Sequence, residues 1–182
     1  MSKTLHQLIK TELVPSGQPG PTHEPDIILL TCSDARIETN EVFPGLSRFE
    51  IRVAGNSISS EVLASIEFAV GHLGVSSMVI MGHTSCAAIA AWHSSEMPSH
   101  DTPMIGAIEK AIAGSSFKSS DLSDSNTAAA ANAIAQAELL RVSSSLIATA
   151  VDEGILEIHS VIKDLNQSGE GVYPARLIVE PS

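Results

Sequence analysis

The chain has 182 residues, of which 43% are hydrophobic and 17% charged, a balance that is typical of one globular domain and excludes a disordered chain. Acidic residues outnumber basic residues by 21 to 10, so the surface potential is expected to be negative and to disfavour a nucleic-acid partner. No apolar run reaches the ~18 residues that span a bilayer, and the first 14 residues lack the apolar core of a secretory signal. We therefore expect a cytoplasmic protein without a membrane partner.

The first segment of the chain has apolar residues at helical spacing and is followed by the turn-rich residues 15–21, which no helix or strand can cross. This pattern predicts an N-terminal helical arm and linker over residues 1–25, ahead of a single α/β domain over residues 26–182. Such an arm either folds back on its own domain or packs against another subunit, and the sequence leaves both open. The residues that define the helix are Leu5, Leu8, Ile9 and Leu13.

Three apolar segments rich in β-branched residues predict strands buried on both faces, over residues 26–31, 49–53 and 77–81. Between the second and third, residues 59–73 carry apolar side chains three or four positions apart, which predicts an amphipathic helix that ends at Gly74. A strand, a helix and a further strand in this order form the crossover unit of a parallel sheet.

The second half of the chain begins with polar, serine-rich sequence after Met97, and residues 114–126 are expected to form a surface excursion. The alanine-rich residues 127–151 predict one long helix, and residues 155–162 and 175–179 predict two further strands. The fold class is therefore α/β, with a mostly parallel central sheet of four to five strands and helices on both faces. The apolar stripe expected on the long helix consists of Leu139, Val142, Leu146 and Ala150.

Both cysteines of the chain lie directly after predicted strands. Cys32 follows the strand over residues 26–31, whereas His83 and Cys86 follow the strand over residues 77–81. Because the carboxyl ends of parallel strands share one edge of a sheet, the three side chains are expected to converge. Burial as small apolar residues is the simpler explanation of two cysteines. Thiolate and imidazole, however, are preferred ligands of Zn²⁺, and a site with three protein ligands leaves a fourth position for water.

Asp34 and Arg36 lie next to the first cysteine, and by themselves such a pair is commonly a surface ion pair of little consequence. Beside a metal, the Arg36 guanidinium could hold the Asp34 carboxylate away from the ion and leave it to accept a hydrogen bond from metal-bound water. If Arg36 let go, Asp34 could become a fourth ligand. Backbone N–H groups from Cys86 to Ala88 either stabilise negative charge on a substrate or simply begin a helix.

Four motifs in this order, C-S-D-A-R from Cys32, R-V-A-G-N from Arg52, S-I-E-F-A from Ser65 and G-H-T-S-C from Gly82, resemble the β-class carbonic anhydrases. The resemblance is strong over residues 26–92. It implies reversible hydration of CO2 to bicarbonate by zinc-bound hydroxide, and a homodimer or homotetramer with exchanged helical arms. It further implies one Zn²⁺ per chain on Cys32, His83 and Cys86, a catalytic pair formed by Asp34 and Arg36, and substrate contacts from Asn56, Ala87 and Ala88.

The chain departs from the family at two positions, since Ala87 stands where glycine is usual and Ser85 where an acidic residue is frequent. Relatives in the same superfamily hydrolyse carbonyl sulfide or carbon disulfide, so a hydrolase that converts carbonyl sulfide to CO2 and hydrogen sulfide is the main alternative. A non-catalytic zinc-binding module is an alternative of another class. A thiol redox protein is disfavoured, because the cysteines lack C-x-x-C spacing.

Overall fold

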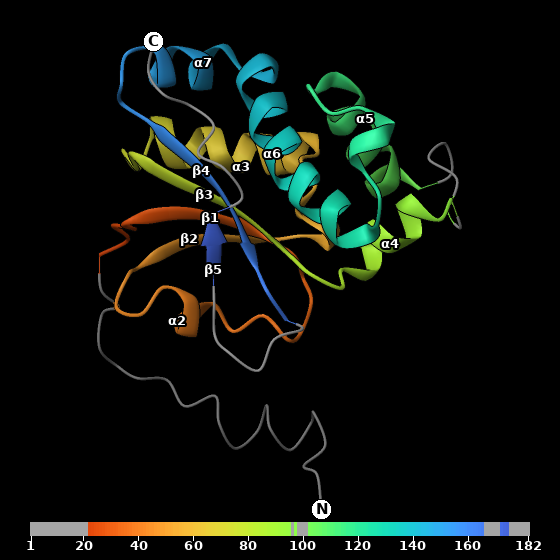
Figure 1. The fold of residues 1–182 in the computed structure, drawn as a ribbon. Helices are drawn as coiled ribbons and strands as arrows, with labels where there is room; N and C mark the ends of the chain where they lie inside the picture. The colour runs from red at the N-terminus through yellow and green to blue at the C-terminus, as the bar shows by residue number, and fades with distance from the viewer. Residues whose placement is uncertain (1–21, 96, 98–101, 166–171, 175–182) are drawn as a thin grey trace, which may run out of the picture.

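The computed structural model describes residues 22–95, 97, 102–165 and the backbone of residues 172–174 (Figure 1). Most of the arm predicted over residues 1–25, and the strand predicted over residues 175–179, lie outside the described residues. Within the described part of the chain, no helix is both long enough and apolar enough to cross a membrane.

The centre of the molecule is a five-stranded sheet with the strand order β2-β1-β3-β4-β5. Neighbours among the first four strands are parallel, and only the edge strand β5 runs antiparallel to its neighbour β4. This confirms the prediction of a mostly parallel sheet with four to five strands. The strands are β1 (Ile27–Thr31), β2 (Arg48–Arg52), β3 (Ser77–His83), β4 (Glu157–Lys163) and β5 (Val172–Pro174).

Helices surround the sheet, as predicted. Figure 1 shows α3, α6 and α7 over one face, the short α2 on the opposite side, and α4 and α5 beyond the carboxyl ends of the strands. The described helices are α2 (Thr39–Val42), α3 (Ser60–Gly71), α4 (Ala87–His93), α5 (Pro103–Gly114), α6 (Ser125–Ser143) and α7 (Ser145–Asp152), with short 3-10 turns η1 (Ala54–Asn56) and η2 (Ser119–Asp121).

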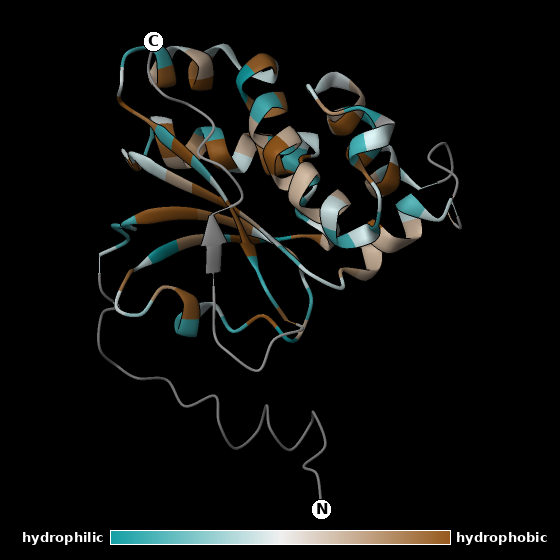
Figure 2. Cartoon of the chain, viewed as in Figure 1, coloured by the Kyte–Doolittle hydropathy of each residue, from teal (hydrophilic) through white to brown (hydrophobic). Residues whose placement is uncertain are grey.

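Strands β1 and β3, in the middle of the sheet, are buried on both faces, which explains their continuous apolar sequences. Figure 2 shows hydrophobic colouring along much of these strands. One face of β1 and β3 packs against α3, α6 and α7 through Ile28, Leu30, Met78 and Ile80. The alternate residues belong to a second apolar cluster, which includes side chains near α2 and in α4, α5 and α6; these strand residues are Ile27, Leu29, Val79 and Met81.

The prediction of a single long helix over residues 127–151 is wrong, because two helices, α6 and α7, meet at Ser144. Ser144 has extended backbone angles, its Oγ accepts a hydrogen bond from the Ile147 N–H, and its hydroxyl donates to Glu67 Oε1 of α3 at 2.6 Å. A serine that caps the following helix ends the preceding one. The predicted apolar stripe fails too, since Val142 is 82% exposed, whereas α6 packs through alanines.

Helix α5 was not predicted, because the serine-rich, proline-containing sequence around it suggested a loop. Pro103 lies in the first turn of α5, where its missing N–H costs no hydrogen bond. The buried residues of this helix have helical spacing and were a usable signal: Ile105, Ile108, Ala111 and Ile112.

Candidate metal centre

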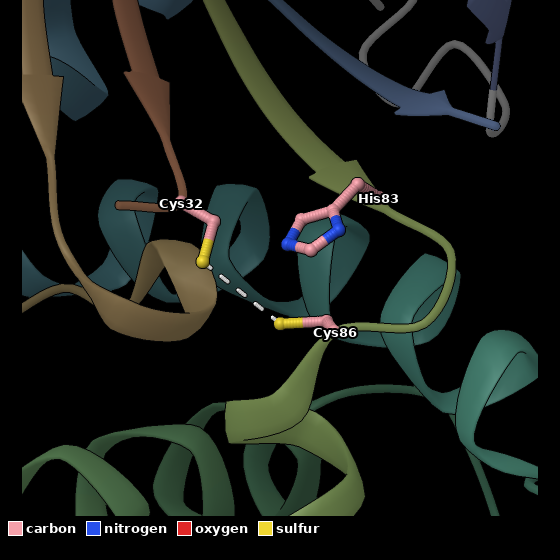
Figure 3. A group of neighbouring side chains, drawn as sticks. All are labelled: Cys32, His83 and Cys86. Carbon is pink, nitrogen blue, oxygen red and sulfur yellow. Dashed lines mark hydrogen bonds between the residues drawn. The ribbon is translucent and has the colours of Figure 1, made fainter. Parts of the chain in front are cut away.

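The candidate centre lies where the direction of strand order reverses. The chain places β2 on one side of β1 and then crosses back to place β3 on the other side. In open parallel sheets, the carboxyl ends of the strands at such a switch point are the usual place for a ligand site. Cys32 follows β1 directly and His83 is the last residue of β3. Cys86 precedes α4, and Figure 3 shows its sulfur and that of Cys32 facing each other beside the His83 ring.

The three donor atoms have the spacing of a zinc site. One ligand atom from each of Cys32, His83 and Cys86 lies within 4.8 Å of the others, and the two Sγ atoms are 3.9 Å apart. Two sulfurs bound tetrahedrally to Zn²⁺ at ~2.3 Å are about 3.8 Å apart. All three residues are buried. The geometry therefore brings together the three residues that the sequence singled out.

The His83 ring is oriented for a ligand. Its Nδ1 lies 3.0 Å from the Thr84 carbonyl oxygen, which assigns the N–H to Nδ1 and leaves Nε2 as the acceptor. Nε2 is fully buried and has no hydrogen-bond partner within the described part of the chain. A buried polar atom without a partner is unfavourable unless something binds it, and a metal ion satisfies this need. The residues present thus fit Zn²⁺.

The two cysteine sulfurs are hydrogen-bonded to each other. The hydrogen bond from the Cys86 thiol lowers the pKa of Cys32 to about 4, and the same bond together with burial raises the pKa of Cys86. The Gly55 N–H also donates to Cys32 Sγ, at 3.4 Å. The backbone N–H groups of Ala88 and Ile89 act on the sulfur of Cys86 and lower its pKa slightly. The surroundings therefore favour the ionised, metal-binding form of the Cys32 sulfur.

Asp34 lies beside this centre and is held by Arg36. Arg36 Nε and Nη2 donate to the two carboxylate oxygens at 2.9 and 2.6 Å, and the Arg36 backbone N–H adds a third bond at 3.0 Å. The side-chain hydrogen bonds from Arg36 are the main reason why the pKa of Asp34 is far below its usual value. Asp34 Oδ2 remains 4.0 Å from His83 Nε2, so the carboxylate lies next to the donors without joining them.

A distant residue, Arg52, holds the backbone around Cys32 and Asp34. Arg52, the first residue of the R-V-A-G-N motif, donates through Nε to the Cys32 carbonyl at 3.2 Å and through Nη2 to the Asp34 carbonyl at 2.8 Å. The sequence marked this motif only as part of a resemblance and assigned no role to its arginine. Arg52 is an exposed residue of β2, so no local pattern in the sequence pointed to these two contacts.

The loop from His83 to Cys86 is held on both sides. Ser85 has a positive φ of 55°, its N–H donates to Asn126 Oδ1 at 2.7 Å, and its carbonyl accepts from Arg36 Nη2 at 3.0 Å. Arg36 therefore contacts both the Asp34 carboxylate and the loop that carries Cys86. Asn126 lies in the segment expected to be a surface excursion, and no local pattern connected it with the site.

The three positions that were predicted to contact substrate have different surroundings. Asn56 is 1% exposed, and its Nδ2 has no partner within the described residues. Ala88 packs close to Gly55, where an added Cβ would lie 3.3 Å from the alanine Cβ. Ala87 is exposed at the start of α4. Among the three, only Asn56 offers a buried donor that the protein itself leaves unused.

Comparison with known proteins agrees with this geometry. The sequence model of the family described as carbonic anhydrase matches residues 27–170. The chain is 32% identical over 163 residues to Carbonic anhydrase 1 of Escherichia coli O157:H7, which covers 82% of this chain and 74% of that protein. It is 41% identical over 70 residues to Carbonic anhydrase 2 of Mycobacterium tuberculosis, covering 37% of this chain and spanning about a third (34%) of that relative.

A solved structure gives the class within this family. The crystal structure of the β-carbonic anhydrase CafA of Aspergillus fumigatus superimposes with a TM-score of 0.66 at 26% sequence identity, covering 84% of this chain and 77% of that chain. The region matched by the family model contains strands β1 to β4, both cysteines and His83. The chain therefore belongs to the carbonic anhydrase family, in its β class.

Proposed function

We propose that the protein binds one Zn²⁺ through Cys32, His83 and Cys86 and catalyses the reversible hydration of CO2 to bicarbonate. The observation that carries this proposal is the unpartnered, buried Nε2 of His83 beside two thiols, with the Asp34 carboxylate 4.0 Å away. Membership of the carbonic anhydrase family supports the reaction.

In this proposal, the side chains of the centre have separate roles. Zinc, when bound, would lower the pKa of a bound water and so supply the nucleophile. Asp34 stays ionised because Arg36 lowers its pKa, so this carboxylate acts only as a hydrogen-bond acceptor and orients the proton of the attacking water. Arg36 also keeps Asp34 from turning toward the donors. Two thiolates and a neutral imidazole cancel the charge of the ion, so activity is expected to increase toward alkaline pH.

Asn56 is the residue that we propose for the substrate side of the site. Its amide nitrogen is buried and has no partner in the described structure. Asn56 also lies next to the candidate centre, because it follows Gly55, whose N–H donates to Cys32 Sγ. A donor of this kind can hold a developing oxyanion. Ala87 and Ala88 remain proposed contacts through their position at the start of α4, although the Ala88 N–H already acts on the sulfur of Cys86.

We further propose that the protein is a cytoplasmic homodimer or homotetramer. β2 is an edge strand that pairs only with β1 in the described residues, and an unpaired strand edge is commonly covered by another chain. Both cysteines are free thiols, as expected in a reducing compartment. Analytical ultracentrifugation of the full chain measures the assembly, and a monomer at micromolar concentration contradicts it.

The function is tested by metal analysis and stopped-flow CO2 hydration of the purified protein from pH 6 to 9. We expect one zinc per chain, loss of zinc in Cys32→Ser, and full zinc but at least a hundredfold lower turnover in Asp34→Ala. Asp152→Ala, which removes an exposed carboxylate of α7, is the matched control and should change neither quantity.

Each contrary outcome points to a different error. Normal turnover in Asp34→Ala contradicts the proposed catalytic role of the Asp34–Arg36 pair. A zinc-containing protein that hydrates no CO2 at any pH supports a binding module, and a faster reaction with carbonyl sulfide than with CO2, measured side by side, supports the hydrolase alternative. Absence of zinc overturns the whole proposal.

A further inference from the structure

A line of buried hydrogen bonds connects α6 with the sulfur of Cys32. Gln136 Oε1 accepts from the Ile58 N–H at 3.0 Å, Gln136 Nε2 donates to Asn132 Oδ1 at 3.0 Å, and Asn132 Nδ2 donates to the Gly55 carbonyl at 2.9 Å. The N–H of the same residue, in the preceding peptide unit, donates to Cys32 Sγ at 3.4 Å. Two amide side chains of one helix thus hold the backbone segment that touches a candidate metal ligand.

These two amides occupy an unusual place. Asn132 and Gln136 are one helical turn apart and both are 0% exposed, on a helix whose other buried positions are almost all alanine. Burial of an amide is unfavourable unless its hydrogen bonds are made, and an alanine at either position would need none. Asn132 and Gln136 make these hydrogen bonds with the backbone of residues 55–58, so their side chains link α6 to that segment.

That segment is a short turn with two internal hydrogen bonds, from the Asn56 N–H to the Val53 carbonyl and from the Ser57 hydroxyl to the Ala54 carbonyl. Gly55 and Asn56 both have positive φ, 64° and 43°, so they form neither strand nor regular helix. An added Cβ on Gly55 would lie 2.9 Å from Ile108 Cδ1 and 3.3 Å from Ala88 Cβ. Gly55 is thus packed by α4 and α5, and its carbonyl is hydrogen-bonded by α6. The N–H of the same residue, in the preceding peptide unit, is directed at Cys32 Sγ.

We propose that Asn132 and Gln136 are positioning residues that fix the Gly55 N–H on the Cys32 thiolate and thereby set how much charge this sulfur donates to the metal. The inference rests on the proposed function, because it requires a metal at the centre. An N–H···S bond draws electron density from the thiolate, so the ion remains a stronger Lewis acid. Changes to groups that bind a metal ligand typically cost ~10- to 100-fold in metal affinity or activity.

The test uses the cobalt-substituted full-length protein, in which thiolate-to-metal charge transfer gives a near-ultraviolet absorption band. Asn132→Ala is expected to fold, because alanine favours the helix and fits the alanine-rich α6. Without the bond to Gly55, the thiolate is a stronger donor, so the band moves to longer wavelength, and turnover of the zinc form falls about tenfold. Gln136→Ala, which leaves the Asn132–Gly55 bond in place, is expected to give a smaller change in the same direction.

Ser160→Ala is the matched control. The Ser160 hydroxyl donates to the Ala133 carbonyl of α6 at 3.1 Å, so this change removes a buried hydrogen bond next to Asn132 without touching residues 55–58. It is expected to lower stability while leaving the cobalt band in place, which separates positioning from general destabilisation. If Asn132→Ala does not fold, the position of the cobalt band in Gln136→Ala is compared with its position in Ser160→Ala, and this comparison tests the positioning role.

The outcomes keep the two proposals apart. A wild-type protein that binds cobalt and zinc through thiolate, together with an unshifted band in both α6 variants, overturns the positioning role and leaves the proposed function intact. A wild-type protein that binds neither metal overturns both.

Discussion

Replacement of Gly82 by alanine tests how closely α6 approaches the strand that carries His83. An added Cβ at Gly82 would lie 2.8 Å from Ile162 Cδ1 and 3.1 Å from the Ala129 carbonyl oxygen. The isoleucine methyl is the end of a flexible side chain and can move. The carbonyl belongs to the backbone of α6, which must move by a few tenths of an ångström to reach ordinary contact distance.

The expected cost follows from these contacts. Overpacking of a close-packed core costs about 1–3 kcal/mol, and the smaller entropy of the unfolded alanine chain returns about 0.4–1 kcal/mol. The free energy of unfolding of Gly82→Ala should therefore fall by about 1–2 kcal/mol, which lowers Tm by roughly 2–8 °C for a chain of this length.

The assay is thermal unfolding followed by circular dichroism at a fixed zinc concentration. Gly114→Ala is the control, since an added Cβ there meets nothing within 4 Å, and its Tm should equal or exceed that of the wild type. Adding Ile162→Val to Gly82→Ala removes the clashing methyl and should recover only part of the loss, because the Ala129 carbonyl remains. If Gly82→Ala unfolds no earlier than Gly114→Ala, the close approach of α6 is not what requires glycine.

Three further changes are expected to have measurable effects. Asp124 caps α6, and hydrogen bonds from Thr127 and Asn126 lower its pKa to about 2. Because a lowered pKa stabilises the fold above the unfolded value of 3.8, the loss of unfolding free energy in Asp124→Asn, measured in urea, should be largest at pH 7 and vanish as pH falls through about 2. A loss of unfolding free energy that does not change with pH contradicts this. Ser144→Ala loses the cap of α7 and the bond to Glu67 and should cost about 1–2 kcal/mol in urea unfolding; an unchanged midpoint argues against the break between the helices. Removal of zinc by a chelator should lower Tm by roughly 8–16 °C, because zinc at ~1,000 times its Kd stabilises by about 4 kcal/mol; an equal Tm with and without chelator speaks against a metal at this site.

The part of the site that could be predicted from the sequence is the part carried by residues next to strand ends. Cys32, His83 and Cys86 follow apolar runs whose lengths and composition predict parallel strands, and in such a sheet the ends meet at one edge. The Asp34–Arg36 pair is two residues apart, so its ion pair required no knowledge of the fold. These contacts depend on short stretches of chain.

The contacts that orient these residues come from distant segments. Asn126 reaches Ser85 over 41 residues, and Asn132 reaches the Gly55 carbonyl over 77 residues. A single asparagine in an alanine-rich helix has no local pattern that identifies its partner. In the sequence, Arg52 likewise looks like an ordinary exposed residue of an edge strand. Only the structure shows its contacts with the Cys32 and Asp34 carbonyls.

By itself, the sequence determined the type of sheet, the three side chains that converge and the edge at which they meet, because hydrophobic periodicity and strand ends are properties of neighbouring residues. Only the tertiary structure decided where the helices break, as at Ser144, and which buried face α6 uses, because alanines pack closely without forming a conspicuous apolar stripe. It also decided that glycine fits best at positions 55 and 82, since the atoms that a side chain there would crowd belong to other elements of the fold.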